Sequence, residues 1–571
     1  MSSCIAPEQH APRAVGLDRS KTHKKSRKLV EGMNNPDIEA MSKVPLRSTD
    51  KATHVPALGV TEGEIPEWLE GSLYRDGPGI LNIGDTWYHH YFDGMAVIHK
   101  FNVKNGEARY SSRILESSTL EKNTKANRIV CGEFATVAYP DPCMTTLQKF
   151  MSRFEMPDLE DITDNCAVNV GFYGDELFAM TETNHMRRID PETLQSIGDK
   201  STISKYVAVN LATAHPHVDE DGTVYNMGNS FTGSKGPTYN IIKFPPPKTL
   251  PDGKKLNSVE QGSVVASIPC QWKMNPGYYH SFHITDNYFI LIEQPLGVSV
   301  PKLVVSQLRN KGLFAAMKWH DDVPTKFRVV RRSNGKELKC HYQAETFFTF
   351  HQINAYEEAG HLVIDTIAFE DGNIINSLFI KNLSDPEVTR NMAVDGAPRR
   401  YVLPLNFKDA QVKTNLVTLN YTKAQAFKLK NGKINLEFEP LTEGRLEMPR
   451  INYKFNGKKY RYCYGFETTN GINAGKLVKV DTVTKQKSFW IADTKCISEP
   501  IFIERPGATE EDDGVVLASL LHADHEKQVQ LLILDAKTFT QLALVTFQTM
   551  GVVTKDLHGL FARDCDTVHR Y

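Results

Sequence analysis

Four histidines in four separate short motifs have the residue type and the spread along the chain that a metal site requires. They are His215, His280, His351 and His558. The first two intervals are 65 and 71 residues, and the third is close to three times their mean. A ring of similar structural units, each placing one imidazole near a common axis, would give this spacing. Any single histidine is more often a hydrogen-bonded core residue, so the metal site is a hypothesis that requires all four to meet.

The chemistry of four neutral imidazoles limits the choice of metal. Such ligands suit iron, zinc, copper or nickel. Zinc held by four protein ligands is normally saturated and structural, whereas a six-coordinate ion keeps two positions open for reactants. Metal-bound histidines also need a partner for the second ring nitrogen, usually a carboxylate. Three glutamates in apolar or strand-like contexts are candidates, although each alone resembles a surface or turn residue: Glu182, Glu447 and Glu499.

The elements that would position these side chains are short strands separated by turns. Clear examples, rich in β-branched or aromatic residues, are 287–293, 361–368, 514–523 and 528–534. A strand that ends in an Asp-x-x-Thr turn occurs three times, at Asp190, Asp481 and Asp535. Both residues can bond their own backbone in a turn. Recurring hairpins in a long chain indicate radial repetition, so we predict an all-β protein, a seven-bladed β-propeller with a helical and loop cap over the metal-bearing face.

Two apolar stripes with helical spacing indicate insertions that build this cap. The first stripe has positions i, i+3, i+4 and i+7 and consists of Leu147, Phe150, Met151 and Phe154. The second runs from about residue 300 to residue 318. Packing within the cap explains both stripes. The alternative is a membrane patch, in which the apolar residues dip into a lipid surface and the basic neighbours Lys149 and Arg153 meet its headgroups.

Composition restricts the class of protein. The 571 residues are 40% hydrophobic and 24% charged, as in ordinary globular proteins, and a net charge of −1 argues against binding to nucleic acid. The nine scattered cysteines contain no CxxC pair, which favours reduced thiols in an intracellular compartment. No apolar run reaches the length of a membrane span. We therefore expect a cytoplasmic protein that associates peripherally with membranes, and no obligate protein partner follows from the sequence.

The N-terminal segment differs from the rest of the chain. It contains seven lysine or arginine residues between Arg13 and Lys28 and has no apolar periodicity. We expect residues 1–54 to be a disordered basic extension and residues 55–571 to form a single propeller domain. The alternative for the extension is a mitochondrial presequence, with a mitochondrial location for the protein.

Several motifs resemble those of the carotenoid cleavage oxygenase family, in particular its animal branch. Besides the four histidine and three glutamate motifs, they are Gly-Ser-Leu-Tyr-Arg-Asp-Gly-Pro-Gly at 71–79, Phe-Asp-Gly-Met at 92–95, Pro-Asp-Pro-Cys at 140–143 and Glu-Glu-Asp-Asp-Gly at 510–514. The resemblance implies a seven-bladed propeller with ferrous iron, Fe(2+), on its axis. It also implies that His215, His280, His351 and His558 are the ligands. Glu182, Glu447 and Glu499 would then orient the imidazoles.

The same resemblance implies the reaction. Members of the animal branch use dioxygen to split a double bond of a carotenoid into two carbonyl products, such as apocarotenals or retinal. Some motifs resemble those of enzymes that cleave centrally, and others those of enzymes that cleave eccentrically, so the sequence leaves the bond open. Two alternatives stay beside this expectation. One is a retinoid isomerohydrolase that acts on retinyl esters, and the other is a non-catalytic carotenoid-binding protein.

Overall fold

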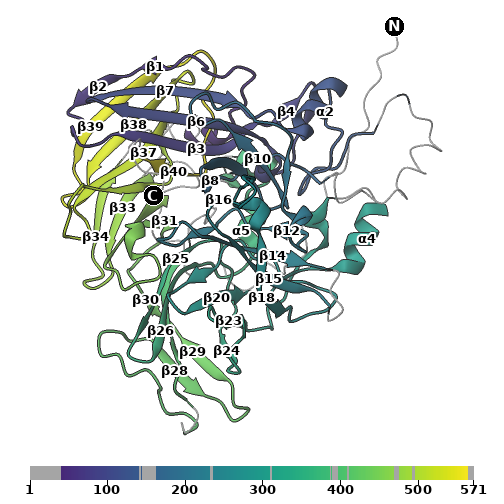
Figure 1. Ribbon diagram of the computed structural model, residues 1–571, viewed down its shortest axis with the longest axis vertical. Coiled ribbons are helices and arrows are strands. Elements are labelled where there is room, and N and C mark those ends of the chain that lie inside the picture. The colour runs from purple at the N-terminus through teal and green to yellow at the C-terminus, as the bar shows by residue number, and fades with distance from the viewer. Residues whose placement is uncertain are drawn as a thin grey trace.

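Seven sheets of four to six strands form the blades of a β-propeller (Figure 1). Their strands pair antiparallel except for one parallel pair, β24 (Tyr342–Ala344) with β29 (Ile434–Glu437). The computed structural model describes residues 40–140, 143, 162–231, 236–308, 312–385, 387–388, 396–407, 411–468, 475–491 and 495–563. The predicted fold class is confirmed.

The first four blades are formed by the following strands. Blade 1 contains β1 (Ala57–Leu58), β3 (Gly71–Ile80), β6 (Met95–Lys104), β7 (Glu107–Ile114) and β40 (His558–Ala562). Blade 2 contains β8 (Asn169–Tyr173), β9 (Glu176–Met180), β10 (His185–Ile189) and β11 (Ser201–Thr202). Blade 3 contains β12 (Leu211–Ala212), β13 (His217–Val218), β14 (Val224–Ser230), β15 (Thr238–Phe244) and β18 (Ser263–Pro269). Blade 4 contains β19 (His283–Ile284), β20 (Tyr288–Glu293), β23 (Thr325–Arg331), β24 (Tyr342–Ala344), β28 (Gln425–Lys428) and β29 (Ile434–Glu437).

The remaining blades complete the ring. Blade 5 contains β25 (Gln352–Glu358), β26 (His361–Ala368), β27 (Ala397–Pro404) and β30 (Glu439–Pro440). Blade 6 contains β31 (Glu447–Ile451), β32 (Tyr462–Thr468), β33 (Gly475–Asp481) and β34 (Lys487–Ile491). Blade 7 contains β2 (Val60–Gly63), β35 (Lys495–Ile497), β36 (Ile501–Glu504), β37 (Gly514–His522), β38 (Gln528–Asp535) and β39 (Gln541–Gln548). Two-stranded ribbons are β4–β5 (Asn82–Ile83, Thr86–Trp87), β16–β17 (Lys248–Thr249, Lys255–Leu256) and β21–β22 (Leu296–Val298, Met317–Trp319).

The ring is closed on its inside and on its outside. Inside, β40 from the C-terminal end pairs with β3, and Asp76 lies opposite His558. Outside, β1 pairs with β7 of blade 1 and the next strand, β2, pairs with β39 of blade 7. Gly59 joins these two strands so close to blade 7 that an added Cβ would lie 2.3 Å from Val545. Both closures fix the first blade against the last.

The hydrophobic core lies between neighbouring blades. One cluster joins Leu73 and Phe101 of blade 1 to Leu531 and Ile533 of blade 7. Because each inner strand is covered by blades on both faces, β3 and β26 are buried along their whole length and do not alternate. This explains why the predicted strands appeared in the sequence as continuous apolar runs.

The predicted strands and turns are present. The four predicted strand ranges correspond to β20, β26, β37 and β38. In each Asp-x-x-Thr turn the aspartate Oδ1 accepts the backbone N–H of the threonine, at 2.7 Å in the Asp190 and Asp535 turns and 3.1 Å in the Asp481 turn. The turn residues therefore satisfy the backbone where the strand direction reverses.

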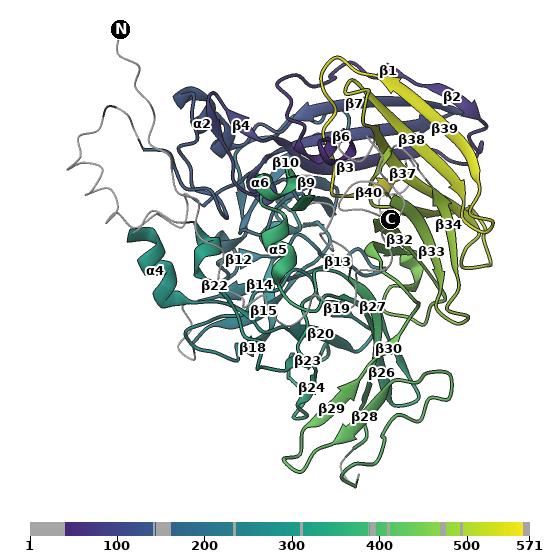
Figure 2. The same ribbon diagram turned by 180° about the vertical axis from the view of Figure 1, so that it is seen from behind.

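Helices and 3-10 turns lie mainly in connections between strands. The helices are α2 (Ser118–Ala126), α4 (Val300–Leu308), α5 (Asn373–Ser377) and α6 (Ile380–Leu383). The 3-10 turns are η1 (Val44–Leu46), η2 (Tyr91–Asp93), η5 (Ile203–Lys205), η6 (Val259–Gln261), η7 (Leu313–Ala316) and η8 (Tyr453–Phe455). The helices gather on the side of the molecule away from the outer strands of blades 6 and 7 (Figure 2).

The predicted helix over residues 300–318 is wrong in its second half. The helix α4 occupies its start, but η7 and β22 follow. Backbone bonds to other segments replace the helical ones: Phe314 N donates to Phe134 O, and Ser299 N donates to Ala316 O. Gly312 also passes so close to Ala135 that a Cβ would lie 2.8 Å from its carbonyl carbon. The apolar stripe therefore does not form a continuous helix.

Packing begins earlier in the chain than the predicted domain start at residue 55. Met41 and Val44 are buried in the core between blades 1 and 7. The Arg47 guanidinium donates to the carbonyl oxygens of His522 and Ala523, at 2.6 and 2.9 Å. Residues 1–39 lie outside the described residues, so the disordered extension stays a prediction.

Candidate metal centre

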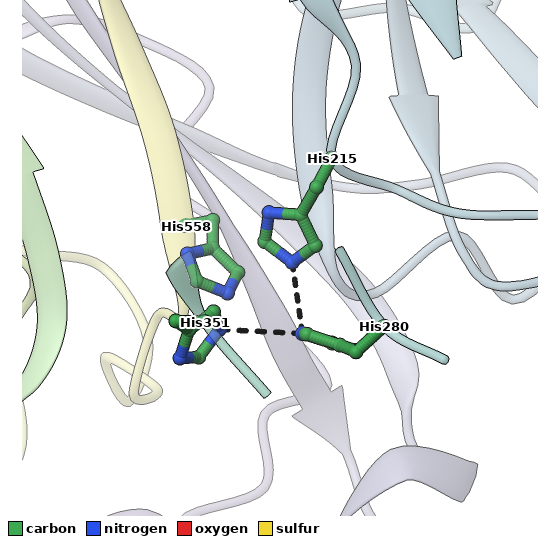
Figure 3. Close-up of side chains that lie close together, drawn as sticks. All are labelled: His215, His280, His351 and His558. Atoms are coloured by element: carbon green, nitrogen blue, oxygen red, sulfur yellow. Dashed lines mark hydrogen bonds between the residues drawn. The ribbon is translucent and has the colours of Figure 1, made fainter. Parts of the chain in front are cut away.

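The four histidines converge although they come from four different blades (Figure 3). His215 lies between β12 and β13, His280 precedes β19, His351 precedes β25, and His558 begins β40. Each therefore sits on the innermost segment of its blade. One nitrogen from each ring lies within 4.8 Å of the corresponding nitrogens of the other three. The structure thus brings together the four histidines that the sequence analysis singled out.

Residues within the histidine motifs tie neighbouring blades together at the centre. The Thr213 hydroxyl donates to the His280 carbonyl and accepts the His215 backbone N–H. The Ser281 hydroxyl donates to the Phe350 carbonyl at 2.6 Å. The hydroxyl groups at these positions thus hold the three inner segments at fixed separations, which sets where the imidazoles can reach.

Each of three histidines is anchored by one of the three predicted glutamates. The Nδ1 atoms of His280, His351 and His558 lie 2.6, 2.6 and 2.9 Å from carboxylate oxygens. The partners are Glu182, Glu447 and Glu499 respectively. The backbone is irregular at Glu447. The register of β31 shifts between Glu447 and Arg450, and Met448 has a left-handed φ of 49°. Every carboxylate belongs to a blade that contributes no histidine.

These anchors decide which ring nitrogen faces the centre. Because a carboxylate accepts the proton on Nδ1, the Nε2 atoms of His280 and His351 carry lone pairs. Those two atoms nevertheless lie 3.2 Å apart, and the Nε2 atoms of His215 and His280 lie 2.8 Å apart. The facing lone pairs of His280 and His351 repel unless a cation lies between them. Metal–imidazole bonds of about 2.0–2.1 Å place neighbouring ligand nitrogens about 3 Å apart when the bonds meet at right angles, so the donor set fits a metal ion.

Burial keeps the imidazoles of His215 and His558 in the form that binds metal. Burial, followed by the proximity of His280, His558 and His351, lowers the pKa of His215 well below its usual value. Burial also lowers the pKa of His558 to about 4, despite the opposing effect of Glu499. Neutral imidazole is the ligand form of histidine. The centre is therefore ready to accept a cation at neutral pH.

Glu499 differs from the other two carboxylates because two arginines contact it. Arg75 Nη1 lies 2.9 Å from Glu499 Oε2, and Arg450 Nε lies 3.5 Å from Oε1. Burial alone would raise the pKa of Glu499, but Arg450, His558 and Arg75 together lower it to about 2. Arg75 is fully buried and also binds Asp556 at 2.9 Å. Glu499 is thus a fixed anion in a network of buried charges.

An aromatic cluster lies against the ring of His280. The Phe350 ring centre is 5.0 Å from that of His280, and the chain of ring contacts continues from Phe350 into the cap. The Tyr278 hydroxyl donates to Glu182 at 3.0 Å, and its ring stacks on Phe348. We define the aromatic cluster by its members: Phe92, Phe134, Tyr278, Phe314, Phe348, Phe350, Phe369 and Phe379.

Sequence reasoning missed the groups that support the centre from further out. Arg75 and Asp556 lie in motifs that were noticed, but nothing in their spacing indicated that strands β3 and β40 bring them together. Arg450 follows Glu447 by three residues, and only the irregularity in β31 directs both toward the axis. Tyr278 lies two residues before His280 in the connection between β18 and β19, and its hydroxyl reaches the same Glu182. That last position is the one signal that could have been used.

Other sequence predictions have mixed outcomes. His217, two residues after His215, donates from Nε2 to the Phe282 carbonyl at 2.8 Å and is not among the four clustered histidines. Leu147, Phe150, Met151 and Phe154 lie outside the described residues, so the membrane patch stays a prediction. Among the residues that the structure does describe, no helix combines the length and the apolar character needed to cross a membrane.

The chain matches known proteins over most of its length. The family model described as "Retinal pigment epithelial membrane protein" matches residues 46–563. The mouse protein named "Beta,beta-carotene 15,15'-dioxygenase" is 40% identical over 515 residues, which are 90% of this chain and 90% of that protein. The human protein named "Carotenoid-cleaving dioxygenase, mitochondrial" is 42% identical over 493 residues, 84% of each chain.

Solved structures share the fold. A crystal structure of cobalt-substituted apocarotenoid oxygenase from Synechocystis aligns with a TM-score of 0.71 at 22% sequence identity. The alignment covers 92% of this chain and 99% of that one. At this level of identity the likeness supports the propeller architecture.

Proposed function

The chain belongs to the carotenoid oxygenase family, whose model carries the name of the retinal pigment epithelial membrane protein, and from this premise we propose that it is an iron(II)-dependent carotenoid dioxygenase. It would cleave one carbon–carbon double bond of a β-carotene-like polyene with dioxygen and release two carbonyl products, apocarotenals or retinal. The named activities of its relatives support this assignment.

One observation supports the metal-dependent part of the proposal most directly. Nε2 lone pairs of carboxylate-anchored histidines face one another across about 3 Å at the centre of the propeller. His215, His280, His351 and His558 would hold the ion. All four are neutral ligands, and bound ferrous iron would supply the activation of dioxygen. Both oxygen atoms go to the product, one to each carbon of the broken double bond.

The residues around the centre have separate tasks. Glu182, Glu447 and Glu499 each hold a protonated Nδ1, so the three Nε2 atoms cannot rotate away from the ion. The aromatic cluster would form an apolar binding surface for a substrate without ionisable groups. The faces of its rings would also stabilise positive charge that develops on a polyene. The distance between the far end of the aromatic cluster and the histidines would then determine which double bond lies at the metal for cleavage.

Delivery of the substrate and the location of the protein belong to the same proposal. Carotenoids partition into membranes, and the membrane patch of Leu147, Phe150, Met151 and Phe154 would collect them there. In the described cap, Val305 of α4 and the nearby Met274 are 44% and 54% exposed, which supports an apolar surface on this side. Relatives named mitochondrial give a precedent for a mitochondrial location, with the basic N-terminal segment as the candidate signal.

A product assay tests the proposal. Purified iron-loaded protein is incubated with β-carotene, with apocarotenals and with retinyl esters, and the products are separated by chromatography. The proposal predicts aldehyde products from carotenoids, with oxygen-18 from labelled dioxygen in both fragments. Conversion of retinyl ester to retinol without uptake of dioxygen would instead identify an isomerohydrolase. Tight carotenoid binding with no product from any substrate would identify a binding protein.

A further inference from the structure

A cavity with both polar and apolar walls borders the histidine centre, and no residue of the aromatic cluster lines it. It encloses about 110 Å³, room for several water molecules. Three of the four histidines line it, namely His215, His351 and His558, together with Arg450, Tyr453 and Asn456. His280, the histidine in ring contact with Phe350, is not among the residues that line it. We name this space the axial cavity.

Two side chains that line the axial cavity, Tyr453 of the turn η8 and Asn456 just after it, bond across the ring of blades. The Tyr453 hydroxyl accepts the backbone N–H of Val218 at 2.9 Å, and the Asn456 amide lies 3.3 Å from His217 Nδ1. Both contacts run from blade 6 to blade 3, across the ring of blades. The neighbouring Lys454 is exposed and pairs with Glu504, so η8 lies at the surface. The turn that carries Tyr453 thus lies between the cavity and the surface.

The charges in the axial cavity are balanced. Arg450 is 28% exposed there, but it pairs with Glu499 and donates to the Gly559 carbonyl at 2.6 Å. The remaining lining groups are neutral amides, hydroxyl groups, imidazoles and apolar side chains. A cation that moves through this space thus meets hydrogen-bonding groups and no unpaired positive charge.

Among the described residues, the aromatic cluster offers a cation no comparable set of hydrogen-bonding groups. A divalent ion that passed between phenylalanine rings would have to give up water without replacement, and an uncompensated charge in an apolar environment is very unfavourable. Water in the axial cavity can stay bound to the ion until the imidazoles replace it.

We infer that the metal ion enters and leaves the histidine centre through the axial cavity, and that Tyr453 and Asn456 control its rate of passage. This inference rests on the proposed metal site. It assigns separate routes to the two components: the polyene approaches from the aromatic cluster and the ion from the turn η8.

Metal-exchange kinetics test the route without any measurement of cleavage. Metal-free protein is mixed with cobalt(II), whose visible absorption reports the rate of binding, and a chelator then reports the rate of release. Tyr453→Ala removes a ring that lines the cavity and should accelerate both rates by on the order of tenfold, about 1.4 kcal/mol of barrier. Since only the route changes, both rates change by the same factor and the Kd for cobalt stays constant.

Two further variants complete the test. Asn456→Leu replaces the polar group with an apolar one and should slow both rates, and it provides the answer if Tyr453→Ala does not fold. Phe134→Ala opens the aromatic cluster instead and should leave both rates unchanged. Wild-type rates in both cavity variants, or faster exchange in Phe134→Ala, would overturn the route. Failure of the wild-type protein to bind cobalt would overturn the metal site and the route with it, whereas normal exchange without carotenoid cleavage would count only against the proposed reaction.

Discussion

The three glutamates at the metal centre should respond differently to loss of their charge. Glu499 is buried between His558 and two arginines, one of which, Arg75, is fully buried. Glu447 accepts only from His351 Nδ1 and the Met448 backbone N–H among the described residues, at 2.6 and 2.7 Å. We therefore expect glutamine at 499 to weaken both the metal site and the fold, and glutamine at 447 to weaken the metal site alone.

The magnitudes follow from these contacts. Loss of a carboxylate partner of a ligand histidine reduces metal affinity or activity by roughly 10- to 100-fold, and this applies to both variants. The pKa of Glu499 is lowered from 4.5 to about 2. Its ionised form thus stabilises the metal-free protein by about 3 kcal/mol above pH 4.5, and this contribution is lost as the pH falls from 4.5 toward 2. Glu447→Gln keeps an oxygen for both donors and should change stability by about 1 kcal/mol.

The assay compares the two variants without metal and with metal. Unfolding of metal-free protein in guanidinium chloride gives the free energy of unfolding, and it is repeated between pH 7 and pH 3. Glu499→Gln should be less stable than wild type at pH 7, and the difference should shrink as the pH approaches 3. Metal content after dialysis against a weak chelator should be low in both variants. Equal destabilisation of the metal-free protein by Glu447→Gln and Glu499→Gln would refute the reasoning, because only Glu499 is held by arginines.

Three other perturbations address the remaining parts of the site. His280→Ala or His558→Ala should abolish metal binding and cleavage while circular dichroism still reports a folded β-protein, and stoichiometric iron in either variant would contradict the ligand assignment. Phe150→Ser combined with Phe154→Ser should release the protein from liposomes and slow cleavage of liposome-borne carotene much more than of detergent-solubilised carotene. Equal losses in the two assays would indicate ordinary packing. Phe350→Ala should change the ratio of aldehyde products at unchanged iron content, and an identical product profile would exclude Phe350 from substrate placement.

The sequence was sufficient to predict those features that depend on a short local pattern. The Asp-x-x-Thr turns at Asp190, Asp481 and Asp535 and the apolar strands are local patterns, and each reappears in the structure. The helix beyond Leu308 was wrong, because the segment after Gly312 bonds to Phe134 and to a ribbon strand. An apolar stripe in the sequence does not reveal which backbone groups pair with one another.

At the candidate site, too, residues with a local pattern could be predicted and residues placed by long-range contacts could not. Histidine and glutamate motifs could be found because metal binding restricts residue type. The positions of Arg75 and Arg450 beside Glu499 could not, since residues separated by as many as 424 positions meet only when the ring closes. Closure also explains the early start of the packed structure: Arg47 contributes by bonding carbonyl groups of blade 7, a role without any local pattern.

The distribution of charge around the centre favours a divalent ion. Glu499 and Asp556 face three cations, Arg75, Arg450 and Lys555, so this part of the surroundings carries a net charge of +1. Glu182 and Glu447 form ion pairs only with histidines among the described residues. Since those imidazoles would be neutral as ligands, the charged groups around the centre sum to −1. A divalent ion would then leave a net charge of +1 in this buried site and a trivalent ion +2, so the surroundings favour the divalent state. In the proposed iron enzyme the outer carboxylates would thus favour the reduced ion, and the four neutral ligands would leave it free to interact with dioxygen.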